Sequence, residues 1–317
     1  MENKKRKSLK LAAGIIMVAV MAFVLSSCNK TTEDTFSAED SANASNESTT
    51  ENTTSEVSDM ASNVLNGSSQ SGSAGGRTEG ITDDRLACAG TQYSATGVTG
   101  YGGTIAVTFP ADGCKDKKGN VRTGGFTITW SGGKWYTVGS IWTVTFNNYT
   151  VNGLAISGTR SHTVTAYTAP TSGSVNFSIT STIQADHTFT WASASSTTSA
   201  ATAQRSENKT RKWDHTAIED TYTVTNGPSS VGAYAASGTN RNKKSWIMNI
   251  TKPLVYLGSC VKSNKTFIPV SGTKQLVVNG GKTYTIDYGI GECDNKFTVT
   301  VDGKSKDIDA KNDGTGD

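Results

Sequence analysis

The residues that could carry acid–base chemistry in this chain are few, and histidine occurs three times, at His162, His187 and His215. His162 and His187 lie beside threonines in segments that alternate like strands, so we expect both rings to be exposed to solvent. A Ser-His-Asp triad remains an alternative interpretation, because the chain is rich in serine. The histidines by themselves do not indicate a catalytic centre.

The densest group of ionisable residues surrounds the third histidine and comprises Asp214, His215, Glu219 and Asp220. A solvated turn before a strand over 222–225 explains this group, and the chain has no Gly-x-Ser-x-Gly sequence to place a nucleophilic serine. A pair of catalytic carboxylates must lie close together in space, and the spacing of residues along the sequence does not show whether two carboxylates do so. We therefore expect a protein that is not an enzyme, with a hydrolase of unrecognised site as an alternative.

The N-terminus has the pattern of an export signal. Five basic residues precede residue 11, and residues 11–25 form an uninterrupted run of apolar or small side chains. This run is short for a helix that crosses a bilayer core of about 30 Å, which needs roughly 20 residues. The pattern therefore predicts a signal peptide over residues 1–27.

The apolar run ends on Leu25-Ser26-Ser27-Cys28, which resembles the lipobox of bacterial lipoproteins. The resemblance implies cleavage before Cys28, a diacylglycerol on its thiol and a further acyl chain on the new amino group. Several acyl chains, at about 0.8 kcal/mol per buried methylene, hold a protein stably on a membrane. Because Asn29 stands where an aspartate would retain a lipoprotein in the inner membrane, we expect an outer-membrane protein on the cell surface or the periplasmic face.

The remaining cysteines form an even set in an exported chain, which predicts two disulfides. They are Cys88, Cys114, Cys260 and Cys293, and three connectivities are possible. Cys114 and Cys293 each sit between two alternating segments, with a glycine turn beyond and one cysteine 26 or 33 residues upstream. This internal repeat favours the pairs Cys88–Cys114 and Cys260–Cys293. Zinc is the rival interpretation, but the chain has no Cys-x-x-Cys pair, and we expect neither a metal nor another cofactor.

Composition changes sharply after the lipobox. Residues 28–80 hold two basic and nine acidic side chains and few large apolar ones. Such a segment cannot offset its ordering entropy by burial, so it is expected to be a lipidated, flexible acidic tether. Apolar residues at i, i+3, i+4 and i+7 from Val57 predict a short helix near 56–66 within it.

From residue 81 onward apolar residues alternate with polar ones, as they do at 126–130, 142–146 and 284–288. One apolar and one polar face per strand is typical of an antiparallel sheet, and Asn-Gly and Asp-Gly pairs between the runs mark hairpins. We predict an all-β domain over residues 81–310. It is expected to be a large antiparallel meander that forms a twisted sheet or a β-sandwich, braced by the two disulfides.

Two segments fall outside this pattern. Residues 192–208 are rich in Ala, Ser and Thr without large apolar side chains, and they are expected to form a long exposed loop. Residues 311–317 are expected to be a disordered tail.

Six tryptophans could include a platform on which a sugar stacks. Trp130, Trp142 and Trp191 share the apolar phase of their strands and are expected in the core. The residues most able to face a ligand are out of that phase or beside basic residues: Trp135, Tyr136, Trp213 and Trp246.

The β domain contains six segments with a distinctive order and spacing: 109–116, 122–129, 145–153, 238–241, 251–254 and 286–295. Together they resemble a family of uncharacterised Bacteroidota outer-membrane lipoproteins. The resemblance implies the same anchoring, but it brings no activity, ligand or catalytic residue.

The sequence therefore favours a lipid-anchored binding or adhesion protein with a glycan or another protein as its ligand. The alternative is a periplasmic carrier that holds an apolar ligand on a curved sheet. A formal charge of +3 does not indicate a partner among nucleic acids.

Overall fold

The computed structural model describes residues 36–70, 83–192, 200–263, 267–279 and 281–310. The predicted signal peptide, Cys28 and the predicted tail at 311–317 lie outside the described residues. The chain divides into two compact units, Met1–Ser37 and Ala38–Asp317, and the second contains every element below. In the described part of the chain, no helix is long and apolar enough to cross a membrane.

The second unit combines two helices with fifteen strands among the described residues. The helices are α2 (Ala38–Gln70) and α3 (Gly258–Ser263). The first strands are β1 (Gln92–Thr99), β2 (Gly102–Thr108), β3 (Cys114–Lys115), β4 (Val121–Ser131), β5 (Ile141–Val151), β6 (Leu154–Thr168), β7 (Phe177–Trp191) and β8 (Ala201–His215). The others are β9 (Asp220–Asn226), β10 (Ala236–Thr239), β11 (Ser245–Leu257), β12 (Ser271–Val278), β13 (Lys282–Ile290), β14 (Lys296–Val301) and β15 (Lys304–Asp309).

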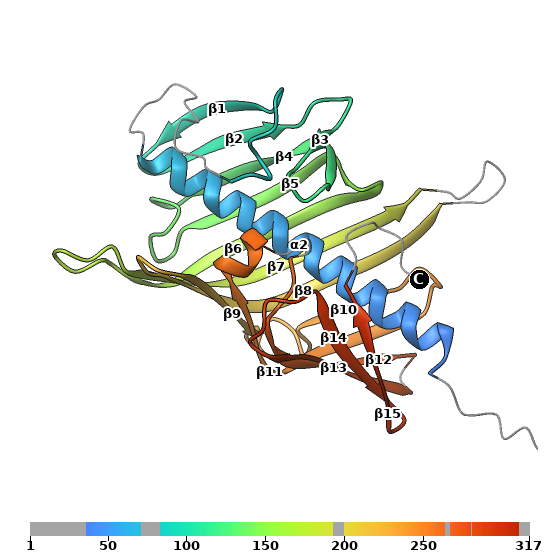
Figure 1. Cartoon of the computed structure of the whole chain (residues 1–317). Helices are drawn as coiled ribbons and strands as arrows, with labels where there is room; N and C mark the ends of the chain where they lie inside the picture. Colours follow the sequence, from blue (N-terminus) through green and yellow to red (C-terminus); the bar gives the residue numbers. More distant parts are fainter. Residues whose placement is uncertain (1–35, 71–82, 193–199, 264–266, 280, 311–317) are drawn as a thin grey trace, which may run out of the picture. The chain divides into compact units, whose positions relative to one another are not determined.

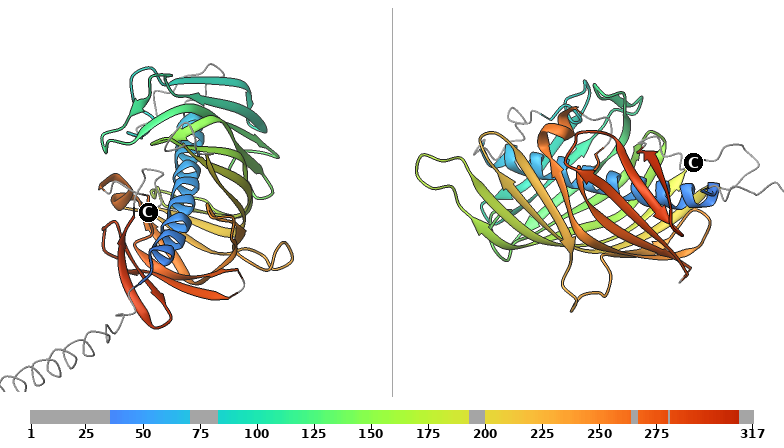
Figure 2. Two further views of the ribbon diagram at one scale, coloured as in Figure 1. Left: turned by 90° about the vertical axis from the view of Figure 1, so that its right-hand side faces the viewer. Right: turned by 60° about the horizontal axis from the view of Figure 1, so that its bottom comes forward.

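All fifteen strands belong to one antiparallel sheet whose order follows the chain. β3 pairs with β4, and β9 and β10 share the place between β8 and β11. The predicted all-β meander is therefore confirmed, in the form of a single sheet. The sheet curves around α2, which lies along its concave side (Figures 1 and 2).

We call the side of the sheet toward α2 the inner face and the opposite side the outer face. The inner face buries the apolar residues of the alternating pattern, and Trp130, Trp142 and Trp191 are in this core as predicted. The hairpin between β5 and β6 turns at Asn152 and Gly153, which have φ values of 49° and 84°. A two-residue Asn-Gly hairpin requires a positive φ at both turn residues, as found here.

The largest correction concerns α2. A flexible tether was expected over 28–80, but residues 38–70 form a helix, and the short helix expected at 56–66 is part of it. The middle of α2 is buried on all sides, so that Asn52 and Thr54 are as inaccessible as the apolar core. The tether prediction was wrong there because it considered apolar area alone, whereas polar side chains can be buried when they are paired.

A second correction concerns the loop expected at 192–208. Strand β8 begins at Ala201, so the second half of that segment is part of the sheet, while 193–199 lies outside the described residues. Ala203, Arg205 and Glu207 occupy its buried alternate positions. Because a small residue and two charges stand where apolar residues were expected, the period of two was not recognised.

Candidate functional site

The inner face of the sheet is basic where it meets α2. Strand β8 directs four alternate buried side chains inward: Arg205, Glu207, Lys209 and Arg211. Arg122 of β4, Arg160 of β6 and Lys274 of β12 add three buried cations. The helix α2 meets them with four buried carboxylates: Glu47, Glu51, Glu56 and Asp59.

The Glu51 cluster joins the N-terminal half of α2 to β6, β8 and β12. It consists of Glu47, Glu51, Glu207, Arg160, Arg205, Lys209 and Lys274. Lys209 Nζ donates hydrogen bonds to both carboxylate oxygens of Glu51, at 2.6 and 2.5 Å. Arg205 bridges Glu51 and Glu47, and its contact with Glu47 measures 2.6 Å.

The Asp59 cluster joins the C-terminal half of α2 to the segment before β1, the β3–β4 turn, β4 and β8. It consists of Glu56, Asp59, Asp83, Asp116, Arg85, Arg122 and Arg211. Arg122 donates to Glu56 of the helix at 2.7 Å and to Asp116 at 2.6 Å. Arg85 pairs with Asp59, which completes the connection between helix and sheet.

Together the two clusters contain seven carboxylates and seven cations, so their charges balance. Burial alone would raise the pKa of Glu51, but Lys209 and Arg205 lower it to about 2. Burial is likewise overcome at Asp83, where Arg85 holds the pKa of the carboxyl well below its usual range. Both carboxyls are therefore ionised at neutral pH, and charge-assisted hydrogen bonds hold α2 in the sheet.

A cleft of about 390 Å³ opens beside the Asp59 cluster. Its walls come from α2, the segment before β1, the β3–β4 turn, β8, β9 and α3, with the lining side chains Asp59, Asn63, Asn66, Asp83, Asp84, Arg85, Lys118, Trp213, His215, Asp220, Tyr222, Val261 and Lys262. Asp220 accepts a hydrogen bond from Trp213 Nε1 at 2.9 Å, and its Oδ1 lies 2.7 Å from His215 Nδ1. The side chains of His215 and Asp220 are each 30% exposed, so a ligand can reach this pair.

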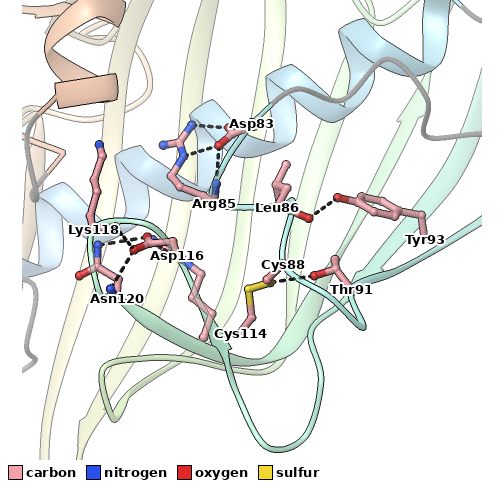
Figure 3. Close-up of a disulfide and its surroundings, with 11 residues drawn as sticks. Asp83, Arg85, Leu86, Cys88, Thr91, Tyr93, Cys114, Asp116, Lys118 and Asn120 are labelled. Atoms are coloured by element: carbon pink, nitrogen blue, oxygen red, sulfur yellow. Dashed lines mark hydrogen bonds and ion pairs between the residues drawn. A yellow bond between two sulfur atoms is a disulfide. The ribbon is translucent and has the colours of Figure 1, made fainter.

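A disulfide fixes the wall that precedes β1. Cys88–Cys114 ties the segment carrying Asp83 and Arg85 to β3, and Arg85 Nε donates to Asp83 at 2.9 Å (Figure 3). The second disulfide, Cys260–Cys293, anchors α3, which also lines the cleft. Both predicted pairs are thus confirmed, and each closure contributes about 3 to 4 kcal/mol in the chain-entropy account.

Three of the four aromatic residues expected to face a ligand lie together. Trp135 stacks on Trp213 with ring centroids 6.1 Å apart, and Tyr136 meets Trp135 edge-on at 5.5 Å. The expected exposure of Trp135 is wrong, because Trp135 and Trp213 are each 4% exposed, although Trp213 still lines the cleft. Trp246 is buried beneath the Arg205 guanidinium, 5.2 Å from its ring, and supports the Glu51 cluster instead.

The expected exposure of His162 and His187 is also wrong, because both rings are buried. His162 stacks on Trp142 with centroids 3.7 Å apart and lies 3.3 Å from the Ser58 hydroxyl of α2. Burial lowers the pKa of His162 well below its ordinary value and that of His187 to about 3. Both are neutral parts of the core, and His215 is the histidine that reaches the cleft.

The chemistry that the cleft offers is polar and nearly neutral. Four carboxylates face two lysines and Arg85, and Arg85 is already paired with Asp59 and Asp83. A ligand would therefore meet the His215–Asp220 pair, which the buried Trp213 indole supports, and nearby amides rather than a strong field of one sign. Among the described residues no group of three or more His, Cys, Asp or Glu side chains could hold a metal ion.

No protein-family model, curated protein or solved structure matches this chain.

Proposed function

We propose that this protein is a lipid-anchored lipoprotein of the outer membrane that binds a neutral glycan in the cleft beside α2. The observation that carries the proposal is the convergence of Trp213, His215 and Asp220 in a cleft of about 390 Å³. The His215–Asp220 pair offers hydrogen-bonding groups of both kinds to the hydroxyls of a sugar, and the buried Trp213 ring holds Asp220 in place. The volume is within the range of small-molecule sites.

The geometry favours this ligand over the apolar ligand of a carrier. Such a carrier would keep the inner face of the sheet open, but α2 fills that face and is held there by the two ion clusters. The cleft that remains is lined mainly by polar side chains. A neutral polar molecule can form hydrogen bonds with these side chains without leaving a charge unpaired. A polyanion, in contrast, would leave charges unpaired there.

The lipobox supports the anchoring half of the proposal. Ala38, where α2 begins, lies ten positions after Cys28 in the sequence. At about 3.5 Å per extended residue, an acylated Cys28 would keep the start of α2 within about 35 Å of the membrane. The linker between the lipid anchor and the β domain would then be short.

The Cys28→Ala variant tests the anchor. In the native host, we expect this variant in the soluble fraction and without incorporated radiolabelled palmitate, because its acceptor thiol is gone. Wild-type protein should fractionate with membranes and carry the label. Acylation of the variant would contradict the anchor.

Calorimetric titration of the soluble Cys28→Ala chain with neutral oligosaccharides of glucose, mannose and xylose tests the cleft. Asp220→Asn preserves the shape of the side chain and removes its charge, so we expect roughly tenfold weaker binding. Asp214→Asn is the matched control, because Asp214 lies on the adjacent strand β8 but pairs with Lys212 and does not line the cleft. Absence of binding by all the sugars, or equal affinity of the two variants, would contradict the cleft as a glycan site.

A further inference from the structure

The outer face of the sheet carries almost no charge over its first half. Strands β1, β2, β4, β5, β6 and β7 contain three Asp, Glu, Lys or Arg side chains, namely Arg122, Arg160 and Asp186. Arg122 and Arg160 are buried on the inner face, which leaves Asp186 as the one charge that these strands expose. Soluble surfaces are commonly a quarter to a third charged, so this face is unusual.

Strand pairing arranges the outer face into two rows of short polar side chains, which we call the hydroxyl track. The first row runs from β4 to β8 through Thr129, Thr143, Ser161, Gln184 and Asn208. The second row runs beside it through Thr127, Thr145, Thr159, Asp186 and Ser206. Neighbours within a row are about 4.8 Å apart and the rows about 6.8 Å apart, so the track spans roughly 19 Å.

Both rows end in a depression on the outer face. Gln184, Asp186, Ser206 and Asn208 line this depression of about 340 Å³, together with Tyr234 from the loop before β10. The Tyr234 side chain is 42% exposed at its rim. The depression is therefore continuous with the track and has an accessible aromatic ring beside it.

Asn208 holds in place the loop that forms one wall of the depression. The residue is 7% exposed, and its Nδ2 donates to the carbonyls of Pro228 and Gly232 at 2.9 and 3.1 Å. Its Oδ1 has no hydrogen-bond partner among the described residues. That oxygen packs against Gly227, so Asn208 shapes the depression through its two bonds to the loop and does not itself offer an acceptor to a ligand.

We propose that the hydroxyl track and the depression beneath Tyr234 bind one chain of a neutral polysaccharide. Hydroxyls donate and accept, so even the Thr143–Ser161 pair at 2.8 Å keeps capacity for a ligand. Over β1, β2 and β4–β7 this face offers no cation to an anionic polymer or lipid headgroup, and its one exposed charge, Asp186, is negative. The track lies on the opposite face of the sheet from the cleft and does not depend on it.

Affinity electrophoresis of the soluble Cys28→Ala chain through gels containing amylopectin, mannan, xylan or laminarin tests the track. We expect at least one neutral polymer to retard the chain. Tyr234→Ala removes the exposed ring, and Thr145→Glu puts a charge in the track, so each should weaken retardation roughly tenfold. Thr283→Glu makes the same change on the exposed outer side of β13 and should leave retardation unchanged.

The contrary outcomes are distinct. Retardation by none of the polymers, or equal retardation of Thr145→Glu and Thr283→Glu, would overturn the track. If Asp220→Asn abolishes retardation while Tyr234→Ala does not, binding belongs to the cleft alone and the track is again overturned. If Thr145→Glu instead abolishes self-association in sedimentation experiments, a second copy of the chain occupies this face.

Discussion

Two neutral imidazole rings are enclosed in a core that is otherwise full of ionised groups. Neither ring nitrogen of His187 has a hydrogen-bond partner among the described residues. Burial, followed by the positive charge of Arg160, disfavours protonation of His162 and lowers its pKa well below the ordinary value. For His187 burial is again the main cause and lowers the pKa to about 3. The folded protein therefore resists protons that the unfolded chain would accept.

This difference predicts a loss of stability in mild acid. Between a pH of about 6.5 and the lowered pKa, the unfolded chain binds more protons than the folded one, so the free energy of unfolding falls as pH falls. Each buried histidine contributes about 1.4 kcal/mol per pH unit in that window. Urea unfolding from pH 7.5 to 5.5 measures the slope in the wild-type chain, and His187→Gln should reduce it. An unchanged slope in His187→Gln would contradict the assignment.

The helix α2 is the element whose stability depends most on its surroundings. It is rich in Ser, Thr, Asn and Asp, which are poor helix formers, and a helix that is polar all round is ordinarily exposed. Several hydroxyls satisfy the helix itself, because Thr50, Thr53 and Thr54 donate to carbonyls in the preceding turn. The carboxylates then provide the contacts that hold the helix in the sheet.

The docking of α2 can be tested with one buried and one exposed carboxylate. Glu51→Gln removes one of the carboxylates that pair with Lys209 and Arg205 and leaves four buried cations facing Glu47 and Glu207 alone in the Glu51 cluster, so we expect about 3 to 5 kcal/mol lower free energy of unfolding. Glu39 belongs to the same helix but pairs with Lys244 at the surface. Glu39→Gln should therefore lower the free energy of unfolding by less than about 1 kcal/mol. Urea unfolding at neutral pH compares them. Equal losses would show that the Glu51 cluster does not hold the helix.

The strands and the helix differ in how far the sequence reveals them. Apolar alternation predicted most strands, and the repeated surroundings of the cysteines predicted both disulfides. The helix was largely missed because Glu47 and Glu51 are one turn apart, whereas Glu56 and Asp59 point to other sides, so no single amphipathic stripe exists. Strand β8 was partly missed for the matching reason, that charges replace apolar residues at its buried positions. Taken alone, the sequence of either element is typical of a solvent-exposed segment, because the charges that it buries are paired with charges of the other element.

The sequence pointed to the residues of only one wall of the candidate site. Trp135, Tyr136 and Trp213 were singled out because they leave the apolar phase or follow basic residues, and the structure brings these three together. Asp59 and Asn63 form the other wall and were overlooked because they lie in the segment expected to be a tether. The opposite charges of residues 28–80 and of the β domain were the available signal.

At the scale of the whole molecule, the basic β domain and the acidic segment before it are partners. Residues 28–80 hold nine acidic and two basic side chains, whereas residues 81–317 hold 23 basic and 17 acidic ones. The acidic partner of the basic inner face is therefore part of the same chain, the helix α2. Under the proposed function the same docked helix also completes the cleft, so binding requires that α2 stay in place.

Hydrogen–deuterium exchange of the soluble Cys28→Ala chain, with and without a bound neutral oligosaccharide, tests this account most directly. We expect the amides of residues 40–66 to exchange as slowly as those of the central strands in the free chain. Added sugar should slow exchange further at the C-terminal end of α2 and at 213–222. Rapid, peptide-like exchange over 40–66, or ligand protection confined to other segments, would contradict the account.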